Sequence, residues 1–541
     1  RVCKADSMHL HIGCTLALLV GSSRALVTPG SSGRLLVCGG SGFLGREVCR
    51  EAVSRGWAVT SLSRRGVNPE PGSTLDAVKW VAGDMSDTGL LTELAAEADA
   101  FVHSVGLLLD RESGLGGVNF ITSGSRSVPA EGATYDTVMR DSAAALAASA
   151  RSGATGGAER PLVYVSAAEA AWCESDGGQK LEAALPEFLA RYLSAKREAE
   201  ALLQGSAGLR VVLARPSLMY DWSKLDVLPL LPIVNPASTL GQRYGGGLGL
   251  LSKMLRVHVV GAAVVAALEA PEARGALSPA DLEQMAPLAA LRRVGPFDTL
   301  TSGLASIARL PYGTTVAEEL RCTGAAGARP KAEQLRLYEF EACPFCRRVR
   351  EVVTYLDLEI TVVPCARGSR HREHVAAAAQ EILGKDRPSF PYLEDDAAGV
   401  RLFESEDIVR HLLAEYGNGA PLPAPEAYFL PSALLTGWVP NLLRPSRGGT
   451  VDARSGGVDP PQPITLYSYD GNQFCRLVRE ALTELDLPYT LVSVGKESPR
   501  RADLAAIAGR STAPYLTDAN TGVAMGESAD ICAYLYREYS A

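Results

Sequence analysis

The sequence predicts a mixed α/β protein built from several domains, and three observations support this fold class. The chain has 541 residues, which at roughly 100–200 residues per domain is enough for three or four domains. Short apolar segments alternate with amphipathic, helix-like segments from residue 33 to about residue 290, a rhythm typical of a parallel sheet built from βαβ units. After residue 296 the pattern changes, and two similar stretches of sequence follow each other.

Composition agrees with folded globular domains and excludes two other classes. Apolar residues make up 47% of the chain and charged residues 21%, and a net charge of −8 argues against a nucleic-acid-binding surface. Eleven cysteines are too few for a disulfide scaffold in a chain of this length. Only Cys343 and Cys346 form a close pair, so we expect a reducing compartment with redox chemistry at this pair. We expect no metal site.

Residues 1–32 are predicted to form a leader. Ile12–Val20 is a short apolar stretch that resembles the core of a targeting peptide, with a disordered leader as the alternative. No run of about 18 apolar residues occurs, so no transmembrane helix is expected. Peripheral association with a membrane or a larger complex stays open.

A glycine-rich loop follows the first predicted strand and opens a helix. It contains Gly39, Gly42 and Gly45, with Phe43 and Leu44 between the last two glycines. Glycines let the backbone approach a pyrophosphate group, which then lies at the helix N-terminus. The sequence therefore predicts a Rossmann dinucleotide-binding domain over residues 33–290, the alternative being a tight turn in a fold that has lost its cofactor.

The end of the second predicted strand indicates which dinucleotide binds. An acidic residue at this place would bind the ribose 2′-hydroxyl, but the chain has Ser63 followed by Arg64 and Arg65. This set suits a 2′-phosphate. NADP(H) is therefore preferred over NAD(H), unless both arginines simply face solvent.

Together with Gly83-Asp84-Met85, the strand 101–106 and Tyr192-x-x-x-Lys196, this loop resembles the extended short-chain dehydrogenases/reductases. The nearest branch includes the nucleotide-binding accessory subunit of respiratory complex I, coenzyme Q biosynthesis factors and plastid relatives. The resemblance implies that Asp84 and Met85 lie beside the cofactor. It also implies that Tyr192 is the acid/base and that Lys196 lowers its pKa.

The third catalytic residue of that family, a serine or threonine, falls at Ala168 in this chain. Ser166 lies two residues too early. A nucleotide that is bound without turnover is therefore an equal alternative to reductase chemistry.

The C-terminal part contains an internal duplication. Residues 335–351 match residues 464–480. Three further pairs of matched blocks keep the same order: 391–393 with 514–516, 404–405 with 527–528, and 304–316 with 439–451. We predict a helical connector at 291–333, a thioredoxin-fold domain at 334–418, a linker at 419–462 and a second thioredoxin-fold domain at 463–541.

The first of these domains carries a dithiol, Cys343-Pro344-Phe345-Cys346, between a strand and a basic helix. A thiol at a helix N-terminus, next to Arg347 and Arg348, is stabilised as the reactive thiolate. Cys343 is expected to attack and Cys346 to resolve the product. The alternative is a buried, incidental cysteine pair.

Glutaredoxins commonly carry this dithiol sequence, and the two domains resemble the tandem glutathione-transferase N-terminal-domain proteins of plants and algae. The resemblance implies a cis Pro391 beside the thiol, with Glu404 and Ser405 binding the γ-glutamyl end of glutathione. In the second domain Pro514, Glu527 and Ser528 take the same places, but Asn472 replaces the attacking cysteine. The resemblance favours a plastid, with the mitochondrion as the alternative.

Three functions follow from these patterns. The first is an NADP(H)-binding, glutathione- or thiol-dependent oxidoreductase that acts on glutathione or a protein disulfide at Cys343. The second is a non-catalytic scaffold or assembly factor that binds nucleotide and glutathione, which Ala168 and Asn472 favour. The third is a quinone- or lipid-related reductase, which Tyr192 and Lys196 favour.

Overall fold

The structure is a computed structural model and describes residues 33–107, 109–110, 112, 132–152, 159–221, 252–321, 332–422, 431–445 and 447–541. The predicted leader, 1–32, lies outside the described residues. The chain divides into two compact units. The first runs to Leu213 and includes Ala273–Ala276, and the second contains Ala214–Glu272 and Leu277–Ala541.

A seven-stranded sheet forms the centre of the N-terminal part, in the order β3-β2-β1-β4-β5-β6-β9. The pairs around β1 are parallel, with Val37 opposite both Ser61 and Val102. Every residue of β4 and of β6 is buried, as expected for a parallel sheet covered on both faces. The strands are β1 (Arg34–Cys38), β2 (Ala58–Ser63), β3 (Lys79–Ala82), β4 (Ala100–His103), β5 (Arg160–Val165), β6 (Leu209–Ala214) and β9 (Gly275–Leu277).

Helices between these strands complete the predicted Rossmann order. Leu36, Phe101 and Leu146 belong to one buried cluster between the sheet and the helices. Asp87 accepts a hydrogen bond from the Leu90 amide and so caps the second helix. The helical segments are α1 (Gly45–Ser54), η1 (Thr74–Ala77), α2 (Thr88–Glu97), η3 (Asp136–Asp141), α4 (Ser142–Ser152), η4 (Ala168–Glu174), α5 (Asp176–Ala183) and α6 (Glu187–Gln204).

The second unit begins with short elements that precede its main sheet. Its first helix, α8 (Val257–Glu269), is buried along nearly its whole length. The His258 ring nitrogen Nε2 lies 3.1 Å from the Ala290 carbonyl oxygen, which joins α8 to α10. The other elements are β7 (Met219–Tyr220), β8 (Leu255–Arg256), α9 (Pro279–Met285) and α10 (Leu288–Leu291).

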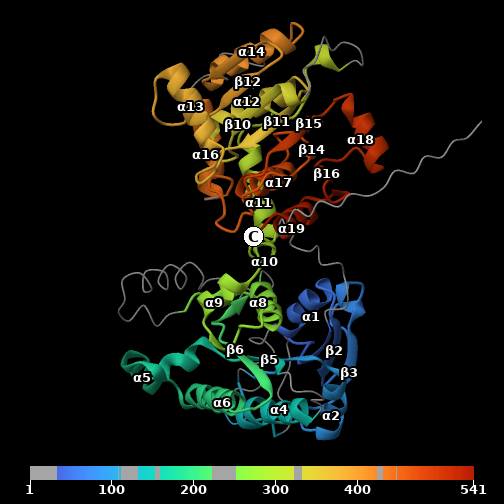
Figure 1. The fold of residues 1–541 in the computed structure, drawn as a ribbon, viewed down its shortest axis with the longest axis vertical. Helices are drawn as coiled ribbons and strands as arrows, with labels where there is room; N and C mark the ends of the chain where they lie inside the picture. Colours follow the sequence, from blue (N-terminus) through green and yellow to red (C-terminus); the bar gives the residue numbers. More distant parts are fainter. Residues whose placement is uncertain are drawn as a thin grey trace, which may run out of the picture. The chain divides into compact units, whose positions relative to one another are not determined.

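An eight-stranded sheet dominates the second unit, in the order β13-β12-β10-β11-β15-β14-β16-β17 (Figure 1). Its two halves join through the antiparallel pair β11–β15, where Thr361 lies opposite Thr490. The first half contains β10 (Leu335–Glu339), α12 (Pro344–Tyr355), β11 (Glu359–Pro364), α13 (Arg372–Leu383), β12 (Tyr392–Asp395), β13 (Val400–Phe403) and α14 (Ser405–Tyr416). The second half contains β14 (Ile464–Ser468), α17 (Gln473–Glu484), β15 (Tyr489–Ser493), α18 (Arg500–Ala508), β16 (Tyr515–Asp518), β17 (Val523–Gly526) and α19 (Ser528–Glu538).

Each half has the order β-α-β-α-β-β-α that the predicted thioredoxin fold requires. The two halves share one core, in which Leu337 and Ile360 from the first half join Leu466 and Leu491 from the second. Because this core crosses the β11–β15 junction, neither half buries its apolar residues alone.

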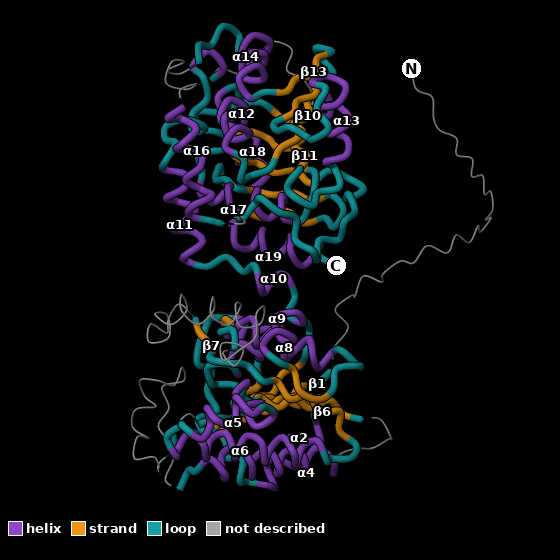
Figure 2. Tube along the Cα trace, turned by 90° about the vertical axis from the view of Figure 1, so that its left-hand side faces the viewer, coloured by secondary structure: helices purple, strands orange, loops and turns teal. Residues whose placement is uncertain are grey.

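Two further helices cover this sheet unit, and Figure 2 shows them side by side along one edge. They are α11 (Pro296–Ile307), within the predicted connector, and α16 (Pro431–Leu443), within the range predicted as a linker. Proline at the first helical turn favours the start of both helices. Two short 3₁₀ turns, η7 (Glu318–Leu320) and η8 (Ala332–Gln334), follow α11.

Among the described residues, no helix is both long enough and apolar enough to cross a membrane.

Candidate functional site

The glycine-rich loop between β1 and α1 is closely packed against itself and against β2. Gly39 has a φ of +88°, a conformation that favours glycine. A Cβ atom on Gly45 would overlap the Gly39 carbonyl oxygen, and one on Gly40 would overlap Ser61 Oγ. The Gly42 amide donates to the Gly39 carbonyl at 2.9 Å. The loop therefore keeps its backbone free of side chains, as a pyrophosphate site at the start of α1 needs.

The residues predicted to bind the ribose end lie at the carboxyl ends of β2 and β3. The Gly66 amide donates to Ser63 Oγ at 3.3 Å, and Arg64 and Arg65 are exposed. Asp84 accepts hydrogen bonds from the backbone and side chain of Ser86, which lower the pKa of its carboxyl, and Arg64 adds to this effect. Two exposed guanidinium groups at this strand end fit a 2′-phosphate.

Tyr192 and Lys196 lie one turn apart on α6, as predicted. Lys196 is buried and its Nζ donates to the Val165 carbonyl at 2.8 Å. Burial lowers its pKa to about 8. The ammonium group lies 5.0 Å from the Tyr164 ring centroid and 5.9 Å from the Tyr192 ring centroid.

Tyr192 itself is held by Tyr135, with ring centroids 5.7 Å apart and an edge-to-face geometry. Burial and the nearby Glu169 carboxylate raise its pKa. That Tyr192 acts as the acid/base and that Lys196 lowers its pKa, as the family resemblance implies, stays a prediction. Ala168 begins η4, and Ser166 Oγ is buried with no hydrogen-bond partner in the described part of the chain.

Cys343 occupies the N-cap position of α12, and its Sγ accepts a hydrogen bond from the Cys346 amide at 3.3 Å. The thiol side chain is 4% exposed and Cys346 is fully buried. Burial, together with Cys343, raises the pKa of the Cys346 thiol well above its usual value. Cys343 is thus the better placed of the two for nucleophilic attack.

The predicted glutathione residues belong to the same half of the sheet unit as this helix start. The Phe390–Pro391 peptide bond is cis, and the Phe390 and Phe340 rings meet edge to face at 5.7 Å. Glu404 has a φ of 66° directly before Ser405, the first residue of α14. The Glu404 carboxylate is exposed, 4.0 Å from Lys385 Nζ. A positive φ at a non-glycine residue is strained, and such strain is concentrated at binding sites.

The second half repeats this geometry at Pro514, Glu527 and Ser528. The Ala513–Pro514 bond is cis, and Glu527 has a φ of 68° at the start of α19. Arg510 pairs with the Glu527 carboxylate at 2.9 Å.

At the thiol position of the second half, Asn472 caps α17 through its own side chain. Its Oδ1 accepts hydrogen bonds from the amides of Phe474 and Cys475, at 2.8 and 3.2 Å. Its Nδ2 donates to the Ala513 carbonyl at 3.4 Å. The Asn472 side chain thus hydrogen-bonds to the backbone carbonyl that directly precedes the cis proline. Cys475 is fully buried.

Four arginines from α12 and α17 form a buried ion network between the two halves. Arg350 Nε lies 2.9 Å from Asp470 Oδ1, and the matching pair, Arg479 Nε with Glu341 Oε2, lies at 2.8 Å. The pattern repeats outward, since Arg347 pairs with Asp470 at 3.3 Å and Arg476 pairs with Glu341 at 2.9 Å. All of these side chains are at most 2% exposed.

This network changes one sequence expectation. Arg347 does not lie free beside the Cys343 thiol, because its guanidinium pairs with Asp470 and donates to the Ala305 carbonyl at 3.1 Å. The attraction of a buried arginine to a buried carboxylate is strong, and a helix residue three positions from a buried neighbour lies on the same face. The repeated Cys-Arg-x-x-Arg pattern in both halves was the signal for this role.

The helices α11 and α16 cross over between the halves, an arrangement that sequence reasoning missed. Helix α11 precedes the first half, yet Ser302 Oγ donates to the Gln473 carbonyl of the second half at 2.7 Å. Helix α16 precedes the second half, yet Gly437 packs against Pro344 of the first. Each thiol-position helix start is therefore covered by the helix that precedes the other half.

The loop after each of these helices also hydrogen-bonds to the half that the helix does not precede. The Gly471 amide donates to the Gly313 carbonyl at 2.7 Å, and the Ala342 amide donates to the Gly448 carbonyl at 3.0 Å. Two buried pairs fix the loops, namely Arg309 with Glu351 at 2.9 Å and Arg444 with Glu480 at 2.8 Å.

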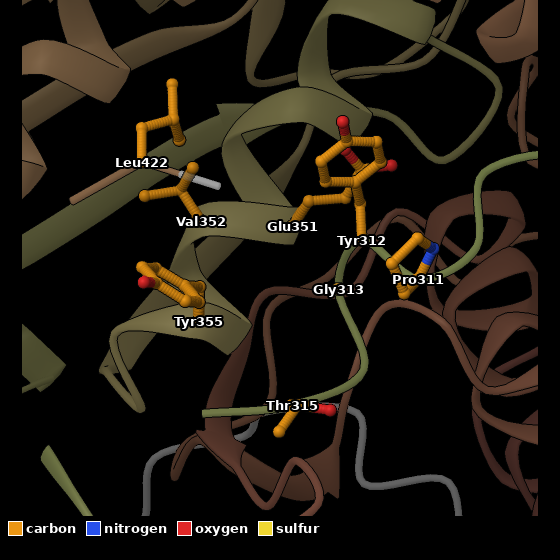
Figure 3. A pocket seen from close by; sticks show the side chains of 8 residues that line it. All are labelled: Pro311, Tyr312, Gly313, Thr315, Glu351, Val352, Tyr355 and Leu422. Atoms are coloured by element: carbon orange, nitrogen blue, oxygen red, sulfur yellow. The ribbon is translucent and has the colours of Figure 1, made fainter. Parts of the chain in front are cut away.

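A cavity of about 150 Å³ lies beside one of these loops (Figure 3). Loop 311–315 and one side of α12 form most of its wall, with Tyr312 and Tyr355 among the lining residues. Cys343 is not among them, so this cavity is separate from the thiol site. No group of three or more potential metal ligands occurs within the described ranges.

Comparisons with known protein families agree with this geometry. Residues 39–230 match the NAD(P)H-binding family, and residues 337–421 and 466–541 match the glutathione S-transferase N-terminal domain.

Individual relatives each match a part of this chain. MIOREX complex component 2 of Saccharomyces cerevisiae is 27% identical over 208 residues, which are 35% of this chain and 73% of the yeast protein. A chloroplastic protein of Arabidopsis thaliana is 43% identical over 60 residues, 11% of this chain and 20% of that protein. A dTDP-glucose 4,6-dehydratase of Mycobacterium tuberculosis is 40% identical over 75 residues, 13% of this chain and 23% of the enzyme.

Solved structures include the Bordetella bronchiseptica enzyme WbmG in complex with NAD, with a TM-score of 0.30, 16% identity and coverage of 47% of this chain and 74% of that one. A short-chain dehydrogenase/reductase superfamily protein from Agrobacterium tumefaciens with bound NAD has a TM-score of 0.29, 18% identity and coverage of 46% and 81%.

The chain thus combines a Rossmann domain that matches the NAD(P)H-binding family with two stretches that match the glutathione S-transferase N-terminal domain. The fold class predicted from the sequence is confirmed by these matches and by the two sheets.

Proposed function

We propose that this chain is a glutathione-dependent thiol oxidoreductase whose chemistry takes place at Cys343, beside a domain that binds NADP(H). The observation that carries the proposal is the position of the Cys343 sulfur. It caps the N-terminus of α12, where it accepts a hydrogen bond from the Cys346 amide. It belongs to the half that also contains the cis Pro391. A sulfur at a helix N-terminus is stabilised as a thiolate.

The proposed exchange proceeds in two displacements. The Cys343 thiolate attacks one sulfur of a glutathione mixed disulfide, a new sulfur–sulfur bond forms, and the substrate leaves as a thiolate that takes up a proton. The thiolate of one free glutathione then attacks the glutathione sulfur bound to Cys343, so that glutathione disulfide leaves and Cys343 is restored as a thiolate. If Cys346 attacks the sulfur of Cys343 instead, glutathione leaves as a thiolate and a Cys343–Cys346 disulfide forms, which two further glutathione thiols reduce while they are oxidised to glutathione disulfide.

Binding of the tripeptide is proposed for Glu404 and Ser405 at the start of α14. Backbone amides at a helix N-terminus attract the carboxylate of the γ-glutamyl group. The exposed Glu404 carboxylate accepts a hydrogen bond from the amino group of the γ-glutamyl residue. The backbone beside cis Pro391 pairs with the peptide part of the ligand.

A thiol-exchange assay with glutathione and a mixed-disulfide substrate tests this proposal. Wild type is expected to be active, Cys343→Ser to lose at least 100-fold, and Cys475→Ser to keep full activity as the matched control. Equal activity in wild type and Cys343→Ser, or no activity in either, would contradict the proposal.

For the Rossmann domain we propose NADP(H) binding at the loop Gly39–Gly45, with Arg64 and Arg65 on the 2′-phosphate. Nicotinamide supplies a hydride when bound. Gly45→Ala is expected to weaken NADPH binding at least 10-fold, since a Cβ there overlaps the Gly39 carbonyl. Gly89→Ala, on α2 with its nearest contact at 3.4 Å, is the control. Changing Arg64 and Arg65 to alanine should weaken NADPH binding more than NADH binding.

A second candidate function, binding without catalysis, is favoured for the second half by Asn472. Its side chain holds both the helix start and the Ala513 carbonyl. In this reading the second half supports the first as a scaffold. Because Ala168 stands where the family has a serine or threonine, we extend the proposal of binding without catalysis to the Rossmann domain. The alternative, which Tyr192 and Lys196 favour, is that this domain reduces a quinone or lipid.

A plastid location is proposed, and the match to a chloroplastic Arabidopsis protein supports it. The mitochondrion stays the alternative prediction. Import of the radiolabelled precursor into isolated chloroplasts and mitochondria distinguishes the two.

A further inference from the structure

Helix α11 presents an unusual surface. Seven of its residues and of the following loop are exposed between positions 296 and 311, and every one of them is apolar. The charged residues of this stretch are turned inward: Arg309 is buried against Glu351, and Asp298 faces Arg444 and Arg447. The exposed side is therefore a continuous apolar stripe. Its members are Pro296, Phe297, Leu300, Leu304, Ile307, Leu310 and Pro311.

The neighbouring elements extend this stripe in the same way. Between residues 437 and 445, the exposed residues are Trp438, Leu442 and Pro445. At the starts of α12 and α17 the exposed residues are Phe345 and Phe474. Because α11 packs on the start of α17 and α16 on the start of α12, these side chains belong to neighbouring helices (Figure 2). We call the set the α11–α16 surface.

The size of the α11–α16 surface exceeds what a monomer normally exposes. It holds nine of the sixteen large apolar side chains that are exposed in the described part of the chain. Their exposed fractions run from 39% for Phe345 to 82% for Leu442. With roughly 150–250 Å² for each large side chain, about half of which is exposed, the surface offers on the order of 700–1,000 Å². Monomers rarely show apolar patches larger than about 600 Å².

We propose that the α11–α16 surface is the interface of a homodimer. The estimated area matches the roughly 800 Å² that each partner buries in a standard interface. Aromatic enrichment and charge depletion are typical of an interface core. The surface also has matching halves, since α11 and α16 occupy equivalent places on the two sheet halves. A second copy related by a two-fold axis therefore meets the same kind of surface that it presents.

A lipid bilayer fits these observations less well. Helices that lie in a membrane interface carry lysine and arginine next to their apolar face. The exposed positions of 296–311, 437–445, 341–350 and 471–480 include no basic residue, and the chain has a net charge of −8. An anionic membrane surface would repel such a protein.

Analytical ultracentrifugation of the full chain tests the proposal. Wild type is expected to sediment as a dimer, with twice the 57.1 kDa mass of one chain, at micromolar concentration. The double variant Leu300→Glu/Ile307→Glu places two charges on the stripe and should raise the dimer dissociation constant at least 100-fold. Ile507→Glu, which changes a residue on α18 that is 53% exposed, is the matched control and should leave the dimer intact.

Circular dichroism and thermal melting check that the double variant is folded. A wild type that stays monomeric up to about 100 µM, or a folded double variant that dimerises like wild type, would overturn the proposal. Flotation of monomeric wild type with vesicles of phosphatidylcholine and phosphatidylglycerol would overturn it as well, and would assign the surface to lipid. A single Leu442→Glu variant is a second disruption from the α16 side and should also weaken the dimer.

Discussion

The two halves of the eight-stranded sheet have the same order of elements and the same backbone at their helix starts, yet they differ in the atom that caps the helix. Cys343 and Asn472 both hold the N-cap position, with φ, ψ of −78°, 119° and −91°, 122°. In the first half the Cys343 sulfur accepts a hydrogen bond from one backbone amide. In the second half the Asn472 side-chain oxygen accepts hydrogen bonds from two backbone amides. The comparison shows that one fold position holds a thiol in one half and a structural amide cap in the other, and the proposed function assigns the nucleophilic role to the thiol.

The same comparison extends to the buried residues at the end of the first strand of each half. Glu339 of β10 corresponds to Ser468 of β14. Glu339 pairs with Arg350, whereas Ser468 accepts from Arg479 at 3.4 Å. The reciprocal ion pairs around these positions are otherwise equal in the two halves, so the first half alone has an additional buried carboxyl group near Cys346.

The largest predicted effect comes from breaking the reciprocal network. Asp470→Asn removes the carboxylate that Arg350 and Arg347 share. Among the carboxylates of the described residues, Arg350 then keeps only Glu339 and Glu341, and Arg347 keeps only Glu351. Loss of one partner of a buried pair destabilises by roughly 3–5 kcal/mol. Urea unfolding should show this loss. Glu341→Gln should cost a similar amount, because it holds the equivalent pairs with Arg479 and Arg476.

Glu406→Gln serves as the control for both variants, since its pair with Arg410 is exposed on a helix surface and should change stability by at most about 0.5 kcal/mol. An unchanged free energy of unfolding in Asp470→Asn would contradict the claim that these ion pairs stabilise the junction of the two halves.

A smaller effect is expected from the pH dependence of stability at Glu339. Burial, with the Glu341 carboxylate nearby, raises the pKa of Glu339 to about 7, although the guanidinium groups of Arg350 and Arg479 oppose the rise. A carboxyl whose pKa is higher in the folded than in the unfolded state stabilises the fold at low pH. This contribution is complete below about pH 4.5 and is lost as the pH rises to about 7.

We therefore expect wild type to lose about 1–3 kcal/mol between pH 5 and pH 8 relative to Glu339→Gln, at 1.36 kcal/mol per pKa unit. Unfolding free energies from urea titrations at several pH values measure the difference. Ser468→Ala in the second half should leave the wild-type slope unchanged. Identical pH profiles for wild type and Glu339→Gln would show that Glu339 is charged throughout this range.

The smallest effect sharpens the comparison of the two caps. Asn472→Ala removes an N-cap acceptor and should destabilise the chain by about 1 kcal/mol. Cys343→Ala should cost less, because sulfur is a weak acceptor. Thermal unfolding of the two variants in parallel checks the order. A larger loss for Cys343→Ala would mean that the thiol, and not the asparagine, has the main structural role.

Local sequence patterns were sufficient for the fold class, whereas the candidate residues of both sites stay predictions. Glycine spacing predicted the loop before α1, and the matched blocks predicted the position of each helix start, while the family resemblance implied the cis proline. These features are local, since a strand, a turn and a helix N-terminus are specified by residues within a short window.

The sequence did not predict which segments that are distant along the chain pack against or pair with one another. The match between 304–316 and 439–451 was visible, but nothing local shows that α11 covers the second half and α16 the first. Likewise Arg347 and Arg348 were expected beside the thiol, and nothing local shows that Glu341 and Asp470 hold arginines of α12 and α17 in a buried network. In the pairs that join the two halves, Arg350 with Asp470 and Arg479 with Glu341, the partners lie 120 and 138 residues apart in the sequence.

The most direct test of the central claim, that exchange chemistry is confined to the first half, is to trap the intermediate. The Cys346→Ser chain, incubated with glutathione disulfide, retains any mixed disulfide because the resolving thiol is gone. Peptide mass spectrometry should find glutathione on Cys343 and none on Cys475. Modification of Cys475, or an unmodified Cys343 in a chain that is otherwise folded, would contradict the account.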